Sequence, residues 1–123
     1  DVPATLAALA QTSVPAGAAP DSENHLSTWL GRDRKPRKFA VSMASNRSLV
    51  LRTQRYKYIS PSQGKPMITW GPKIETGYSP TPQLYDLSRS PYENENIAEK
   101  KPRTLHELQT LLDALRTDAS PQK

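Results

Sequence analysis

The chain has 123 residues, a formal net charge of +5 and an isoelectric point of about 9.6. Only 35% of its residues are hydrophobic, and it has one Phe and 12 Pro, which limits the core and favours a small, loop-rich module. The absence of Cys excludes disulfides, thiolate metal sites and a thiol nucleophile. No apolar run approaches the roughly 20 residues that cross a bilayer, and the sequence shows no targeting signal.

The sequence predicts a helix over residues 1–10. Asp1 occupies the N-cap position and Pro3 falls in the first turn, where its missing N–H is not needed. One face of this helix is apolar and carries Val2, Leu6, Leu9 and Ala10. Because a helix of about ten residues is marginal by itself in water, we expect this face to need a packing partner.

A linker and a second short helix come next. Residues 12–20 are rich in Ala, Pro and Gly, which is typical of a linker. A helix is expected over residues 21–30, with Asp21 or Ser22 as its N-cap and Gly31 ending it. Its apolar side consists of Leu26, Trp29 and Leu30.

Four short strands are predicted for the rest of the chain, from their alternation of apolar and polar residues. They are Phe39–Met43, Ser48–Arg52, Arg55–Ser60 and Gln83–Asp86. The second and third form a hairpin around Thr53-Gln54, a poor sequence for the favoured two-residue turns, which need positive φ angles. Tyr56 and Tyr58 share one face of the third strand. Residues 61–82 form a loop too long for a mere connection, so it is functional or disordered.

The last element is predicted to be an amphipathic helix. Thr104 and Glu107 match a capping box, with Pro102 just outside the helix. The apolar stripe recurs every three or four residues and consists of Leu105, Leu108, Leu111, Leu112 and Leu115. The expected fold class is therefore α+β: an antiparallel sheet of about four strands packed by a C-terminal amphipathic helix, with an N-terminal helix and long loops.

Two segments carry a family resemblance: LVLRTQRYKYIS at Leu49–Ser60 and QLYDLSRSPYENENIAEKKP at Gln83–Pro102. In this order, and followed by a Leu-rich helix, they resemble the C-terminal end of arylsulfatase-like sulfatases of the alkaline-phosphatase-like superfamily. That family typically has Leu-Tyr-Asp-Leu-x-x-Asp-Pro-x-Glu-x-x-Asn-Leu-Ala, and the chain follows it with Ser90 in place of the second Asp. The resemblance implies that residues 1–31 are the end of the catalytic-domain region plus a linker, and that residues 32–123 are the C-terminal α+β subdomain.

The resemblance also implies where the chemistry lies. Sulfatases of this kind use a formylglycine made within a Cys/Ser-x-Pro-x-Arg motif and a calcium ion held by Asp and Asn side chains, and this chain has neither the motif nor a paired Asp-Asp. Calcium and formylglycine are therefore expected in the N-terminal catalytic domain of the parent enzyme, which would be this chain's partner. The chain alone is predicted to be inactive, and the parent to be a bacterial enzyme that is periplasmic or secreted.

Candidate substrate contacts lie in the long loop and near the first predicted turn. Trp70 followed by Lys73 is an aromatic and cationic pair suited to stacking on a sugar ring beside an anionic group. By analogy with subdomains that border the cleft for sulfated glycans or aryl sulfates, the candidates are Trp70, Lys73, Asn46 and Arg47. The alternative interpretation is that Trp70 anchors a small hydrophobic cluster and that the basic residues are solvated surface.

Other polar residues are predicted to be architectural. Asp86, Glu93 and Asn96 are expected to bond to backbone N–H groups in the turn between the last strand and the last helix. His25 and His106 are expected to be ordinary surface residues, because neither has a recognisable partner in the sequence.

The charge distribution leaves a second function open. Between Arg32 and Lys73 the chain has 11 Lys or Arg residues and one acid, a cationic zone suited to polyanions unless it is simply solvated surface. A free-standing module that binds nucleic acid is therefore the alternative, with Arg55-Tyr56-Lys57-Tyr58 as a stacking platform. Steeply salt-dependent binding to oligonucleotides would distinguish it from the sulfatase hypothesis.

Overall fold

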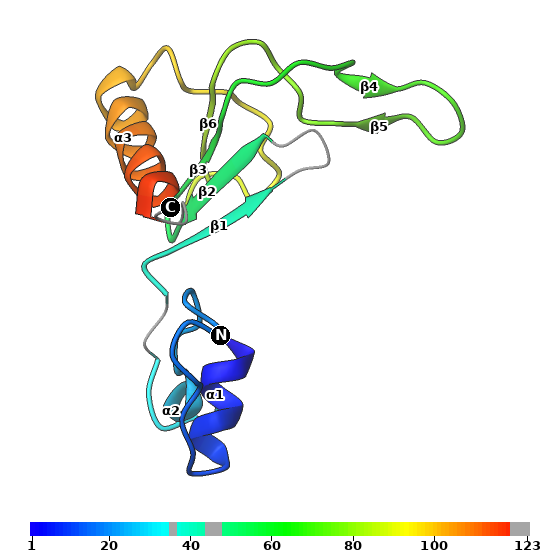
Figure 1. Cartoon of the computed structure of the whole chain (residues 1–123). Helices are drawn as coiled ribbons and strands as arrows, with labels where there is room; N and C mark the ends of the chain where they lie inside the picture. Colours follow the sequence, from blue (N-terminus) through cyan, green and yellow to red (C-terminus); the bar gives the residue numbers. More distant parts are fainter. Residues whose placement is uncertain (35–36, 44–47, 119–123) are drawn as a thin grey trace. The chain divides into compact units, whose positions relative to one another are not determined.

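The residues described by a computed structural model of the chain are 1–34, 37–43 and 48–118 (Figure 1). They fall into two compact units, Asp1–Arg37 and Lys38–Lys123. The two units are built on different principles. The first is held together by polar contacts, and the second has a hydrophobic core.

The first unit contains α1 (Val2–Leu9) and α2 (Leu26–Trp29). The second helix is a single turn, much shorter than the predicted 21–30. The preceding residues do not join it because they bond to α1 instead: the Ser22 hydroxyl accepts from Ala4 N (3.0 Å), and His25 N donates to the Thr5 hydroxyl (3.0 Å). His25 thus occupies the N-cap position of α2, contrary to the prediction of Asp21 or Ser22.

The end of each helix in the first unit has a left-handed residue. Gly31 (φ 69°) follows α2, as predicted, and Gln11 (φ 54°) follows α1. In both cases the N–H of this residue and the N–H of the next one return to the last helical turn. After α2, Gly31 N donates to Thr28 O (3.0 Å) and Arg32 N to Ser27 O (2.8 Å). After α1, Gln11 N donates to Ala8 O (3.2 Å) and Thr12 N to Ala7 O (2.9 Å). This Schellman pattern satisfies carbonyls that the helix itself leaves unpaired.

The second unit is built on a four-stranded antiparallel sheet, which confirms the predicted fold class. Its strand order is β1-β2-β3-β6, and its strands are β1 (Phe39–Met43), β2 (Leu49–Thr53), β3 (Tyr56–Ile59) and β6 (Gln83–Asp86). The register pairs Arg52 with Lys57, so the two-residue turn is Gln54-Arg55, one residue later than predicted. The Thr53 hydroxyl fixes this turn by accepting from Tyr56 N (2.9 Å) and donating to Tyr56 O (3.2 Å).

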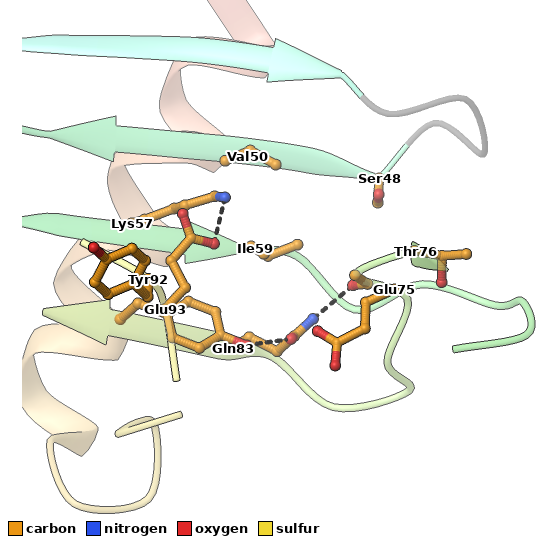
Figure 2. Close-up of a pocket in the computed structure, with 11 residues that line it drawn as sticks. Ser48, Val50, Lys57, Ile59, Glu75, Thr76, Gln83, Tyr92 and Glu93 are labelled. Carbon is orange, nitrogen blue, oxygen red and sulfur yellow. Dashed lines mark hydrogen bonds and ion pairs between the residues drawn. The ribbon is translucent and has the colours of Figure 1, made fainter. Parts of the chain in front are cut away.

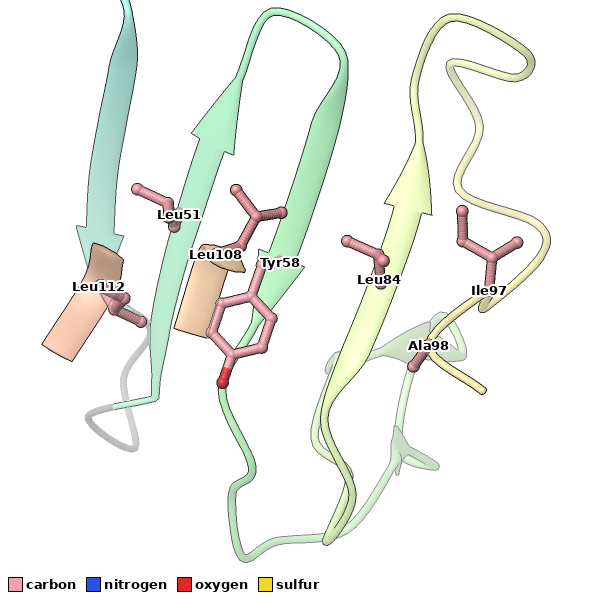
Figure 3. Packing of buried hydrophobic residues seen from close by; sticks show 7 residues of the cluster. All are labelled: Leu51, Tyr58, Leu84, Ile97, Ala98, Leu108 and Leu112. Carbon is pink, nitrogen blue, oxygen red and sulfur yellow. The ribbon is translucent and has the colours of Figure 1, made fainter. Parts of the chain in front are cut away.

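Helix α3 (Pro102–Asp118) packs on one face of this sheet and forms the core (Figure 3). The buried cluster consists of Leu51, Tyr58, Leu84, Ile97, Ala98, Leu108 and Leu112. The predicted capping box is wrong. The helix begins at Pro102, and Leu105 N donates to the backbone oxygen of Lys101 (3.0 Å). Pro102 therefore occupies the first helical position, where its fixed φ favours a helix start.

The long loop is not structureless. It contains a small hairpin of β4 (Met67–Ile68) and β5 (Ile74–Glu75), which the sequence analysis did not predict. Thr76 closes its base: its N donates to Pro66 O (2.9 Å) and its hydroxyl to the backbone oxygen of Lys65 (2.7 Å). In Figure 1 the hairpin extends beyond the end of the main sheet.

Asn96 fixes the path from the sheet to α3. Its side-chain oxygen accepts from Leu84 N (3.0 Å) and from Ala98 N (3.0 Å), and Ile97 N donates to Leu84 O (2.8 Å). These bonds cover the outer edge of β6 and carry Ile97 and Ala98 into the core. One amide oxygen thus satisfies two backbone donors that have little access to water.

Replacing Asn96 by Ala is expected to destabilise the second unit by roughly 2–4 kcal/mol, because two N–H groups would lose their acceptor. The midpoint of thermal unfolding, followed by circular dichroism, should fall by roughly 10 °C or more. The matched control is Asn94→Ala. Asn94 is exposed, so its loss should shift the midpoint little; equal shifts for the two variants would refute the role given to Asn96.

Candidate functional site

The sheet has a hollow of about 340 Å³ on the face opposite α3 (Figure 2). Side chains alternate along a strand. Because Leu51, Tyr58 and Leu84 point toward α3, their neighbours in β2, β3 and β6 line the opposite face. The hollow is lined by Ser48, Val50, Lys57, Ile59, Glu75, Thr76, Gly77, Gln83, Tyr85, Tyr92 and Glu93. The main sheet, the base of the β4–β5 hairpin and the turn before α3 thus all contribute.

Two hydrogen-bonded groups organise the floor of the hollow. Lys57 Nζ forms an ion pair with Glu93 (2.6 Å). The Tyr85 hydroxyl donates to the Gln83 side-chain oxygen (2.7 Å), and the Gln83 amide nitrogen donates to Gly77 O (2.7 Å). The second group ties the sheet to the hairpin, so the hollow is held from both sides.

The electrostatic surroundings are those of a mildly acidic, hydroxyl-rich surface. Among the described residues that line the hollow, Lys57 is the one cation, and its charge is offset by Glu93, while Glu75 adds a second carboxylate. Burial raises the pKa of Tyr85, and the charges of Glu93 and Glu75 add to the effect, so its hydroxyl stays a neutral donor. Such a lining suits hydroxyl and amide groups of a ligand better than a sulfate group.

Glu93 is placed by an unusual backbone conformation. Its φ is 55°, in the left-handed region that non-glycine residues seldom adopt. Its carboxylate thereby reaches Lys57 on β3, 36 positions away in the sequence. Glu93 was predicted to bond to N–H groups of the turn, whereas its side chain pairs with Lys57.

Two of the four predicted substrate contacts can be located in the structure, and both lie in the β4–β5 hairpin outside the lining of the hollow. Trp70 is 79% exposed and Lys73 is exposed, and both lie in the connection between β4 and β5. The same hairpin contributes Glu75, Thr76 and Gly77 to the hollow. Asn46 and Arg47 lie outside the described residues. Trp70 and Lys73 do not line the hollow, and the role of all four residues in binding stays a prediction.

Sequence reasoning missed the hollow because its residues come from five separate segments. The alternation in β3 does indicate that Lys57 and Ile59 share a face. What it does not indicate is that Tyr85 and Gln83 stand next to them, since that follows from the pairing of Lys57 with Tyr85 across β3 and β6. The register between strands far apart in the sequence was the missing information.

Asp86 is a structural anchor of the turn that follows β6. Its carboxylate forms an ion pair with Arg55 (2.9 Å) and accepts from the backbone N (3.2 Å) and the hydroxyl (2.6 Å) of Ser88. The hydrogen bonds from Arg55 and then Ser88 lower the pKa of Asp86 from 3.8 to about 2. The start of β3 and the end of β6, which lie side by side in the sheet, are thus joined by an ion pair as well as by the strand pairing.

The proposed nucleic-acid platform is not assembled. Tyr58 is 2% exposed and lies in the core, so it cannot stack on a base. Arg55 is paired with Asp86 and Lys57 with Glu93. Tyr56 is half-buried, with Arg55 and Lys101 over its ring at 5.1 and 5.6 Å. The residues of that motif are used by the fold, which disfavours the nucleic-acid alternative.

Among the described residues, no three His, Asp or Glu side chains gather in a way that could hold a metal ion. The sequence has no Cys/Ser-x-Pro-x-Arg motif of the kind in which formylglycine is made. The described helices include none that is long and apolar enough to span a membrane. The geometry found here suits binding of a ligand or of a neighbouring polypeptide.

Comparison with known proteins supplies the context of this module. No family model matches the chain. An N-acetylgalactosamine-6-O-sulfatase of Bacteroides thetaiotaomicron is 42% identical over 117 residues, which are 95% of this chain and 23% of the relative. The chain corresponds to a C-terminal part of a sulfatase. It spans about a quarter of the length of that sulfatase.

A solved structure supports the same assignment. It comes from work on the metabolism of multiple glycosaminoglycans by Bacteroides thetaiotaomicron, and it matches this sulfatase part with a TM-score of 0.85 and 40% sequence identity. The match covers 93% of this chain and 24% of the solved chain. The resemblance inferred from Leu49–Ser60 and Gln83–Pro102 is therefore confirmed.

The lowered pKa of Asp86 predicts an acid-dependent loss of stability. A carboxylate whose pKa is depressed on folding stabilises the fold above its unfolded pKa, near 3.8, and this contribution is lost as the pH falls toward about 2. In Asp86→Asn the fall in melting temperature between about pH 4 and pH 2 should be smaller than in the unchanged chain. Glu99→Gln removes an exposed carboxylate and should keep the full pH dependence; a wild-type slope in Asp86→Asn would contradict the prediction.

Proposed function

We propose that the chain is a non-catalytic C-terminal part of a sulfuric ester hydrolase, which in the intact enzyme completes the fold and borders the substrate cleft. The observation that carries this proposal is the match of 95% of the chain to 23% of a sulfatase. The described residues add a hairpin that extends past the main sheet and exposes Trp70. A protruding aromatic side chain beside a polar hollow is what a carbohydrate-contacting rim requires.

The proposed substrates are sulfated glycans, with aryl sulfates as a second possibility for the same cleft. The relative is named an N-acetylgalactosamine-6-O-sulfatase, and we extend that substrate class to the parent of this chain. Trp70 would stack on a sugar ring, and Lys73 would pair with an anionic group of the glycan. Asn46 and Arg47 complete the set of proposed contacts on sequence grounds.

Catalysis is assigned to the rest of the parent enzyme. Its N-terminal catalytic domain would hold the formylglycine and the calcium ion, which together supply the nucleophile and stabilise the sulfate charge. The contribution of this chain is to bind and orient the glycan beside that centre. We also propose that the parent is periplasmic or secreted, as its resemblance to glycan sulfatases implies.

A chimera tests the proposal directly. The C-terminal quarter of the Bacteroides sulfatase that matches this chain would be replaced by the chain itself, and hydrolysis of N-acetylgalactosamine 6-sulfate would be measured. The chimera is expected to be active, and the isolated chain inactive. An unfolded or inactive chimera, beside an active parent sulfatase, would refute the claim that the chain completes this kind of enzyme.

Substitutions in the active chimera test the rim. Trp70→Ala and Lys73→Ala should each raise KM by about threefold to tenfold with little change in kcat, because each removes a contact to the substrate remote from the reacting sulfate. Lys65→Ala is the control, since it removes an exposed cation at the base of the same hairpin. If all three variants keep the KM of the chimera, the hairpin does not contact the glycan.

A further inference from the structure

The described residues of the first unit form no hydrophobic core. Of its described residues, Thr5 alone is buried. Its large apolar side chains are instead about half exposed: Val2 53%, Leu6 49%, Leu9 56%, Trp29 54% and Leu30 49%. Five such residues within a 37-residue unit are unusual for a surface that stays in water.

The orientation of α1 explains this exposure. At 100° per residue, Val2, Leu6 and Leu9 lie within about 60° of one another on the helix surface. A different side of α1 faces its own unit, through Ala4 N, which bonds to Ser22, and the buried Thr5 hydroxyl, which bonds to His25 N. The helix therefore gives its small and polar residues to its own unit and leaves its large apolar stripe uncovered.

Polar contacts hold the unit in this arrangement. Arg37 forms ion pairs with Asp1 (2.6 Å) and Glu23 (3.4 Å), and His25 lies between the same two carboxylates at 3.6 and 3.5 Å. His25, expected at the surface, has a side chain only 15% exposed. Partly exposed ion pairs add little stability, yet these pairs connect the start of α1, the segment before α2 and the end of the unit.

We propose that the α1 stripe, with Trp29 and Leu30, is the surface through which residues 1–37 pack against the catalytic domain of the parent sulfatase. This inference rests on the proposed function. The match indicates which polypeptide covers this surface. About three quarters of the relative lies outside the matched part, and the match is to a C-terminal portion. That preceding polypeptide is the apolar partner that α1 lacks. Residues 1–37 thus belong in packing to the catalytic domain, and residues 38–118 form their own core.

Amide hydrogen exchange tests the assignment with the isolated chain and the chimera described above. In the isolated chain the amides of α1 should exchange almost as fast as in a short peptide, since a helix of this length with one buried side chain is marginal. In the chimera they should be slowed by about a hundredfold or more. Amides of β2 and β3 are the internal reference and should be protected in both proteins. Equal α1 exchange in the two proteins would overturn the inference even if the chimera is an active sulfatase, whereas an inactive, unfolded chimera would defeat the proposed function itself.

A pair of substitutions provides a second readout. Leu6→Asp combined with Leu9→Asp should leave the unfolding of the isolated chain unchanged, because neither side chain is buried there, and should lower the melting temperature of the chimera. Ile74→Asp, which charges an apolar residue 52% exposed in the second unit, is the control and should change neither. If Ile74→Asp lowered the melting temperature of the chimera as much as the double substitution, the assignment of the α1 stripe as the packing surface would be refuted. Self-association of the isolated chain that the double substitution abolishes would identify a second copy as the occupant and would likewise overturn the proposal.

Discussion

The packing of α3 on one face of the sheet is the constraint on which the second unit depends. Leu108 and Leu112 pack on Leu51, Tyr58 and Leu84. The face of the sheet that α3 covers determines on which face every other side chain of the strands lies. Because the strands are pleated, the residues that do not meet α3 lie together on the far side of the sheet. The polar hollow with Lys57 and Tyr85 is thus the counterpart of the core, produced by the same alternation.

Much of this fold could be predicted from the sequence, because its main elements repeat. The Leu spacing of α3 and the alternation in β1, β2 and β3 each extend over several residues, so their type and approximate bounds were predictable. The hairpin β4–β5 was missed because strands of two residues have no measurable period. The hairpin is closed by hydrogen bonds of Thr76 to Lys65 and Pro66, and no local sequence pattern predicts these bonds.

The candidate site was harder to predict for the same reason. Trp70 and Lys73 stand out in the sequence as an aromatic residue near a cation, and the structure leaves both exposed. The hollow beside them depends on the pairing of β3 with β6 and on the left-handed Glu93, which places a carboxylate against Lys57. Residue types alone suggested the proposed contacts Trp70 and Lys73, whereas the floor of the hollow depends on tertiary pairing. In the first unit, the apolar stripe of α1 could be predicted from the sequence, whereas the ion pairs of Arg37 and His25 could not.

The bonds of Asn96 and Ile97 to Leu84 have a consequence for assembly. They occupy backbone groups on the outer side of β6, so that edge of the sheet is closed to a further strand. Within the part of the chain that the structure describes, β1 pairs with β2 alone and its other side carries no strand. A sheet with one open edge can be extended once, by joining two open edges, and cannot grow further. Edge-to-edge association of the four-stranded sheet through β1 would therefore end at a pair of sheets.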